Sequence, residues 1–100
     1  MVLQRFEEKT ALITGGGGMG RAVALRLLSE GGRVLVTDYS QDILARLKQE
    51  FDELGYSDRT RFLLSDVRIY RDCCVAVQKG VEWFGKIDIL VTTAGILRHH

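Results

Sequence analysis

The chain has 100 residues, a formal net charge of +1 and 46% hydrophobic residues, which fits one domain with a modest core. The near-neutral charge argues against nucleic acid or an anionic membrane as the main partner, because both bind basic surfaces. No apolar run resembles the core of a signal peptide or reaches the roughly 20 residues that cross a bilayer. We therefore expect a soluble, cytoplasmic protein.

The cysteines and histidines give no sign of a metal site. Cys73 and Cys74 are adjacent, which excludes an ordinary disulfide between them and gives no metal-ligand spacing. We expect both to be small buried hydrophobic residues on a helix. His99 and His100 are expected to be exposed residues at the end of the chain.

The first half of the chain alternates apolar runs with amphipathic segments. Residues 10–14 predict a buried strand that ends in glycines, and residues 21–30 predict a largely buried helix that Gly31 and Gly32 end. Residues 33–37 predict a second strand. A second helix follows, capped by Ser40 or Asp38 and ended by Gly55. Its apolar stripe is expected at Ile43, Leu44, Leu47, Phe51 and Leu54.

The second half repeats the pattern. Residues 60–64 and 87–91 predict strands, and residues 70–84 predict a helix between them that Gly85 ends. The apolar face of that helix is expected at Cys74, Val77, Val81 and Phe84. Strands that alternate with helices predict a parallel sheet, and a glycine-rich first turn favours the doubly wound order 3-2-1-4. The fourth strand would then be an exposed edge, so residues 1–100 are expected to be one truncated domain, the first half of a Rossmann-type α/β fold.

Six residues between the first strand and the first helix form a glycine-rich turn. Residues 15–20 read Gly-Gly-Gly-Gly-Met-Gly and fit the pattern G-x-G-x-x-G. Glycines there allow a sharp turn and the approach of a pyrophosphate to the main chain, while the helix N-terminus offers N–H groups and a positive dipole. A merely flexible turn is the alternative, whereas a P-loop is excluded because no Lys-Ser or Lys-Thr follows.

An acidic residue ends the second strand. Asp38 follows Gly20 by eighteen residues, where a carboxylate accepts hydrogen bonds from an adenosine ribose and repels a 2′-phosphate. Tyr39 comes next and is not basic, so NAD is favoured over NADP. Asp38 could instead serve only as a helix N-cap.

Four motifs together resemble the short-chain dehydrogenase/reductase family. They are Thr14 with the glycine turn, Asp38, Asp66-Val67, and residues 89–95, which read Ile-Leu-Val-Thr-Thr-Ala-Gly. The resemblance implies a pyrophosphate turn and places Asp66-Val67 beside the adenine. It also implies that Asp38 and Tyr39 lie at the ribose and that a turn at Thr93, Ala94 and Gly95 lies along the cofactor. The residues implied at the pyrophosphate turn are Gly15, Gly17, Gly18, Met19 and Gly20.

The chain departs from the family pattern at two places. Its glycine turn is one residue shorter than T-G-x-x-x-G-x-G, and Thr92-Thr93 replaces Asn-Asn. The family's catalytic serine and Tyr-x-x-x-Lys pair have no counterpart here, because no lysine follows Tyr39, Tyr56 or Tyr70 at the fourth place. We therefore assign no catalytic residue to this chain.

The resemblance implies the cofactor-binding part of an NAD-dependent enzyme that interconverts alcohols and ketones by hydride transfer. The 100 residues alone are expected to be inactive, and the full-length protein is expected to form a homo-oligomer with a small-molecule substrate. A stand-alone dinucleotide-binding module without catalysis is the first alternative. A methyltransferase-like domain that binds a nucleoside sulfonium is the second.

Overall fold

The computed structural model describes residues 6–66 and 68–92, which form a four-stranded parallel sheet with helices on both faces. The strands are β1 (Thr10–Thr14), β2 (Arg33–Asp38), β3 (Thr60–Leu64) and β4 (Ile89–Thr92). The helices are α1 (Gly18–Ser29), α2 (Gln41–Glu53) and α3 (Tyr70–Phe84), with a turn of 3-10 helix at Ser57–Arg59. The order β3-β2-β1-β4 confirms the predicted Rossmann-type topology.

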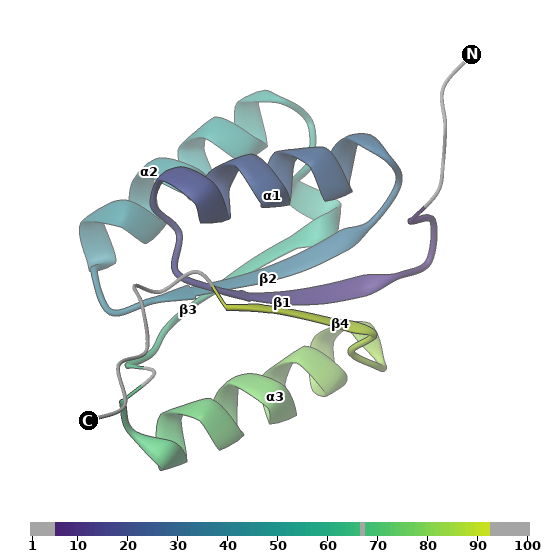
Figure 1. Cartoon of the computed structure of the whole chain (residues 1–100). Helices are drawn as coiled ribbons and strands as arrows, with labels where there is room; N and C mark the ends of the chain where they lie inside the picture. The colour runs from purple at the N-terminus through teal and green to yellow at the C-terminus, as the bar shows by residue number, and fades with distance from the viewer. Residues whose placement is uncertain (1–5, 67, 93–100) are drawn as a thin grey trace.

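The helices lie in two layers. Helices α1 and α2 cover one face of the sheet and α3 covers the other (Figure 1). Successive side chains of a strand point to opposite faces, so Ile13 and Val36 pack under α1 and α2 while Leu12 and Leu35 pack against α3. Both faces of β1 and β2 are therefore buried, which explains why their sequences are continuously apolar.

Several element boundaries differ from the prediction. Helix α1 begins at Gly18 rather than Arg21, so the end of the glycine turn is also the first turn of the helix. Strand β4 begins at Ile89 rather than Ile87, whose side chain packs against the core on the α3 side of the sheet. Ser40 rather than Asp38 caps α2, since its hydroxyl accepts a hydrogen bond from the N–H of Ile43 over 3.3 Å.

The predicted apolar face of α3 is wrong except at Phe84, which packs against the sheet. Val77 and Val81 are 49% and 46% exposed, and Ala76 and Gly80 face the sheet instead. A Cβ at Gly80 would lie 2.7 Å from Cδ1 of Ile87, so the small residues bring the helix close to the sheet. The expected burial of both cysteines is also wrong, because Cys74 on this outer face is exposed and Cys73 is half-buried.

The predicted burial of Leu54 is also wrong. It was expected to complete the stripe of α2, but it lies just after the helix as its C-cap and is exposed. The stripe is formed by Leu44, Leu47 and Phe51, all of which are buried.

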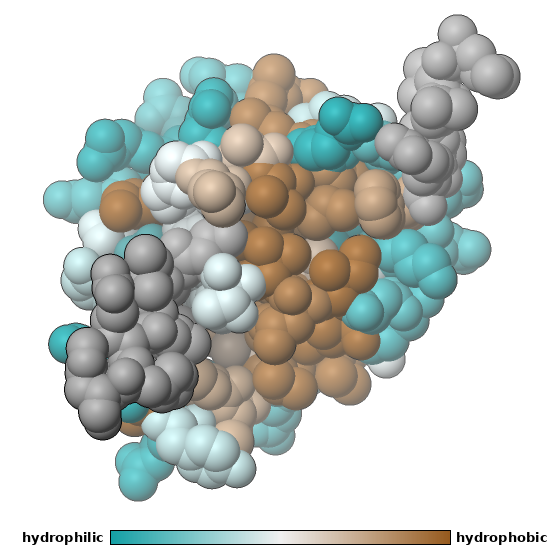
Figure 2. Space-filling view, in the orientation of Figure 1, coloured by the Kyte–Doolittle hydropathy of each residue, from teal (hydrophilic) through white to brown (hydrophobic). Residues whose placement is uncertain are grey.

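Strand β4 forms one edge of the sheet. Leu90 is 64% exposed there, and Figure 2 shows an apolar surface that extends over this edge between α1 and α3. Within the two described ranges, no helix is long and apolar enough to cross a membrane, and no cluster of His, Cys, Asp and Glu side chains could hold a metal ion.

Candidate nucleotide-binding site

Backbone hydrogen bonds hold the carboxyl ends of three strands together. The N–H of Gly15 donates to the carbonyl of Thr37 over 2.6 Å, and the N–H of Ser65 donates to the carbonyl of Asp38 over 2.9 Å. The glycine turn, Asp38 and the residues that follow β3 are therefore neighbours. This is the edge at which open parallel α/β sheets bind their ligands.

The N-terminus of α1 is free to receive an anion. Gly17 is its N-cap, its first turn contains no acidic residue, and no side chain of residues 6–66 or 68–92 caps it by a hydrogen bond. Within the described part of the chain, a Cβ placed on Gly17 or Gly18 would meet no atom of a more distant residue within 4 Å. Gly18 also has a φ of +26°, which disfavours other residues. The open backbone and the positive helix end fit the pyrophosphate of a dinucleotide.

The remaining glycine-turn residues differ in their surroundings. Met19 is 71% exposed, whereas Gly15 and Gly20 are buried. Gly16, which was not predicted as a site residue, has a packing role: its Cβ would lie 2.6 Å from Cδ1 of Leu47. A larger residue there would require the Leu47 side chain of α2 to shift.

The carboxylate of Asp38 is fixed at the edge of the turn. It is 8% exposed, its Oδ2 accepts from the N–H of Gly16 over 2.8 Å, and its Oδ1 accepts from the N–H of Ser40 over 2.8 Å. A carboxylate has about four acceptor positions, so both oxygens can still accept hydrogen bonds from a diol. Tyr39, which follows, is 75% exposed.

Asp66 is engaged by a neighbour that the sequence analysis did not identify. The guanidinium of Arg68 donates through Nε to Oδ1 over 3.0 Å and through Nη2 to Oδ2 over 2.7 Å. These hydrogen bonds lower the pKa of Asp66 to about 2. The spacing of the two residues could have indicated this pair. Val67, Thr93, Ala94 and Gly95 lie outside the described residues.

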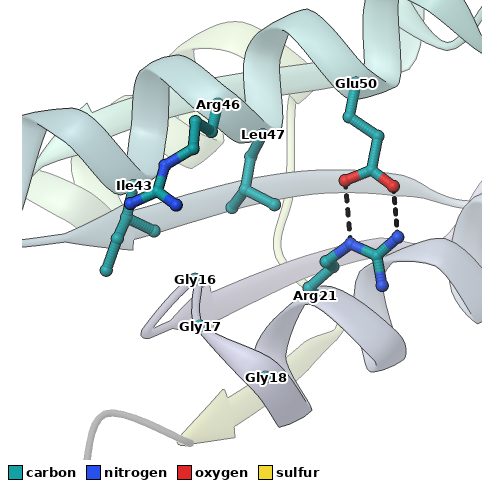
Figure 3. A pocket seen from close by; sticks show the side chains of 8 residues that line it. All are labelled: Gly16, Gly17, Gly18, Arg21, Ile43, Arg46, Leu47 and Glu50. Atoms are coloured by element: carbon teal, nitrogen blue, oxygen red, sulfur yellow. Dashed lines mark hydrogen bonds and ion pairs between the residues drawn. The ribbon is translucent and has the colours of Figure 1, made fainter.

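An opening with a volume of about 410 Å³ lies between α1 and α2, beside the glycine turn (Figure 3). Its walls are three glycines, two apolar residues and three charged residues: Gly16, Gly17, Gly18, Ile43, Leu47, Arg21, Arg46 and Glu50.

An ion pair spans this opening. The guanidinium of Arg21 on α1 donates through Nε to Oε1 of Glu50 on α2 over 2.8 Å and through Nη2 to Oε2. The hydrogen bonds raise the pKa of Arg21 and lower the pKa of Glu50. The two residues are 29 positions apart, so sequence spacing could not have revealed the pair.

The tyrosines of the described residues show no catalytic arrangement of the kind that the resemblance implies. Tyr70 is 84% exposed, and its hydrogen bond with the Cys74 side chain raises its pKa. Tyr56 packs against the guanidinium of Arg59, whose Cζ lies 5.1 Å from the ring centre. Neither tyrosine has a lysine at the position that would lower its pKa.

Comparison with known proteins extends over nearly the whole chain. A family model described as short chain dehydrogenase matches residues 9–100. The chain is 39% identical over 90 residues to 3beta-hydroxysteroid dehydrogenase 2 of Eggerthella lenta, which covers 89% of this chain and 34% of that protein. It is 37% identical over 89 residues to 15-hydroxyprostaglandin dehydrogenase [NAD(+)] of Bos taurus, covering 88% of this chain and 34% of that protein.

A solved structure agrees with these sequence matches. A short-chain dehydrogenase/reductase described as a glucose/ribitol dehydrogenase from Brucella melitensis superposes with a TM-score of 0.84 at 32% identity. The match covers 98% of this chain and 40% of that one. The chain thus spans about a third of the length of the curated relatives that it matches. With the fold and the sequence in agreement, the chain belongs to the short chain dehydrogenase family, a family of oxidoreductases that bind nicotinamide dinucleotides.

Proposed function

We propose that this chain is the NAD-binding part of a dehydrogenase that interconverts alcohols and ketones by hydride transfer. The observation that carries the proposal is the open glycine turn at the N-terminus of α1 with the Asp38 carboxylate hydrogen-bonded to Gly16 at its edge. In this arrangement, N–H groups that would bind the pyrophosphate lie next to a carboxylate that would hold the ribose. Family membership supports the same interpretation over a methyltransferase-like one.

Each part of the site has a distinct task in cofactor binding. The first N–H groups of α1 would hold the pyrophosphate, with Gly17 and Gly18 offering no side chain in its way. Asp38 would accept hydrogen bonds from the ribose hydroxyls, with Tyr39 beside it. Asp66 and Val67 would border the adenine, and Thr93, Ala94 and Gly95 would lie along the cofactor.

The preference for NAD is proposed from charge. Gly16 and Ser40 hold Asp38 at the edge of the turn by hydrogen bonds to both carboxylate oxygens. A carboxylate fixed there would repel the 2′-phosphate that distinguishes NADP from NAD. The bovine relative whose name includes NAD(+) is consistent with this choice.

The reacting groups are proposed to lie elsewhere in a longer protein. When bound, NAD supplies the hydride acceptor, and the chemistry also needs a group that takes up the proton of the alcohol. This chain would bind and orient the cofactor, while a serine and a Tyr-x-x-x-Lys pair in the rest of the protein would handle the proton. That protein would be a homo-oligomer acting on a small alcohol or ketone.

Two measurements test the proposal. The coding DNA beyond the codon for His100 should continue into a serine and a Tyr-x-x-x-Lys pair, and the encoded protein should reduce NAD in the presence of secondary alcohols. The 100-residue chain should bind NADH without turnover. A stop codon after His100 together with NADH binding would favour the module without catalysis, and binding of S-adenosylmethionine in place of NADH would refute the proposal.

A further inference from the structure

The opening between α1 and α2 adjoins the proposed ribose site. Gly16 lines the opening, and its N–H donates to Oδ2 of Asp38 over 2.8 Å. The carboxylate proposed to hold the ribose is therefore hydrogen-bonded directly to a residue in the wall of the opening. A group attached to the 2′-oxygen would lie next to this opening.

The two arginines that line the opening differ in their hydrogen bonding. Arg21 is held by Glu50 through two parallel hydrogen bonds, with side chains that are 48% and 31% exposed. Arg46 extends from α2 toward the glycine turn, and it has no ion pair or hydrogen bond among the described residues (Figure 3). One of two guanidinium groups is thus committed to a carboxylate and the other is available.

A phosphate dianion has several acceptor oxygens and can bind more than one guanidinium. Arginine binds phosphate by the same two-pronged geometry with which it binds a carboxylate. As long as Glu50 occupies Nε and Nη2 of Arg21, that pair of parallel donors is not available to a phosphate. Among the described residues that line the opening, Arg46 is then the guanidinium without an ion pair. Loss of the carboxylate would leave two guanidinium groups on the walls of the same opening.

We propose that Glu50 is a specificity-determining positioning residue, which disfavours NADP by holding Arg21 away from the 2′-phosphate site. This inference rests on the proposed function and deepens its cofactor preference. Asp38 would act on the 2′-phosphate directly by repulsion, whereas Glu50 acts through Arg21 by removing a donor. Arg46 supplies the residual affinity for the phosphate.

The test compares the dissociation constants of NADH and NADPH for purified variants, measured by titration calorimetry. Glu50→Gln keeps the size of the side chain and should strengthen NADPH binding relative to NADH about tenfold, the effect of one hydrogen bond to a charged group. Asp52→Asn is the matched control, because it removes an equal charge from the Lys48–Asp52 pair on the same helix. Its ratio of dissociation constants should equal that of the wild type.

A double-mutant cycle separates a route through Arg21 from a general effect of charge. In an Arg21→Gln background, Glu50→Gln should leave the ratio unchanged. The inference would be overturned if Glu50→Gln changed the ratio of dissociation constants as much in that background as in the wild type. It would also be overturned if Asp52→Asn changed the ratio by the same amount.

A third variant keeps the test decisive if Glu50→Gln does not fold. Arg46→Gln should weaken NADPH binding several-fold and leave NADH binding unchanged, and an unaltered NADPH affinity would contradict the inference. Failure of the proposed function has a different signature, since the wild type would then bind neither cofactor or would bind NADPH as tightly as NADH. If the wild type binds NADH, and if Glu50→Gln leaves the ratio of the NADH and NADPH dissociation constants unchanged, only the inference is overturned.

Discussion

The carboxylate of Asp38 accepts a hydrogen bond from the backbone N–H of Gly16 over 2.8 Å, which joins the end of β2 to the turn that follows β1. The same carboxylate accepts from the N–H of Ser40, the residue that caps α2. A single buried acid thus fixes the relative positions of the turn, the strand end and the next helix. Its proposed role in ribose binding uses a group that the fold already orients.

Charge reversal at Asp38 should change the cofactor preference. In Asp38→Arg we expect NADPH to gain about 1–3 kcal/mol over NADH, the range of hydrogen bonds to charged groups. The variant should also be less stable, because the N–H groups of Gly16 and Ser40 lose their acceptor. Titration calorimetry with both cofactors gives the preference, and urea denaturation gives the free energy of unfolding.

Asp42→Arg provides the control for this prediction. Asp42 is an exposed acid in the first turn of α2, so its reversal makes the same change in net charge close by. A shift of the cofactor preference as large in this variant would show that Asp38 has no special role.

Substitutions at two adjacent glycines should have separate effects, one on stability and the other on NADH binding. Gly16→Ala should lower the free energy of unfolding by about 1–3 kcal/mol, because its Cβ would overpack against Leu47 at 2.6 Å. Gly17→Ala has open space around the new methyl group, so its stability should change little. That methyl group would instead stand where the pyrophosphate approaches, and NADH binding should weaken.

Urea denaturation and NADH titration of both variants check this prediction. If Gly17→Ala bound NADH as tightly as the wild type, the pyrophosphate would not contact the turn there. If Gly16→Ala were as stable as the wild type, the close packing of α2 on the turn would be wrong.

The ionisation of Asp66 should depend on Arg68. We expect the pKa of Asp66 to be about 2 in the wild type, because hydrogen bonds from Arg68 stabilise the carboxylate. In Arg68→Gln it should rise toward the ordinary value of 3.8. Carboxyl chemical shifts followed by NMR against pH measure both values, with Arg71→Gln as the control at an exposed arginine. A wild-type pKa that already lies near 3.8 would exclude the pair in solution.

The Arg21–Glu50 pair should stabilise the fold in a pH-dependent way. The pKa of Glu50 is lowered from its ordinary 4.5, so the stabilisation is present above that pH and is lost as pH falls through the lower pKa of the folded state. Wild type and Glu50→Gln should differ in Tm at neutral pH and converge in acid, because a protonated glutamate resembles glutamine. Thermal denaturation across this pH range measures the difference, and a gap that persists in acid would contradict the ion pair.

The sequence was sufficient for the arrangement of the sheet because apolar strands and amphipathic helices alternate clearly. It was not sufficient for α3, where Val77 and Val81 were the obvious apolar face and yet point outward. Gly80 and Ala76 face the sheet instead, and Ile87 lies close to Gly80. A pattern based on hydrophobicity alone gives no weight to a glycine.

The local backbone of the candidate site could be predicted from the sequence better than its side-chain contacts. The glycine turn follows directly from a local motif, and Asp38 follows from its place as the acidic residue that ends the second strand. Arg21 and Glu50 meet only because α1 and α2 lie side by side on one face of the sheet, which depends on the packed fold. The role of Gly16 likewise appears only when Leu47 is packed above it.

The most direct test of the central claim is a titration of the purified protein with NADH and, separately, with NADPH under identical conditions. We predict that NADH binds and that its affinity exceeds that of NADPH by about tenfold or more, as expected where one charged group discriminates between two ligands. Absence of NADH binding, or NADPH binding as tight as that of NADH, would contradict the assignment of the glycine turn and Asp38 to an NAD site.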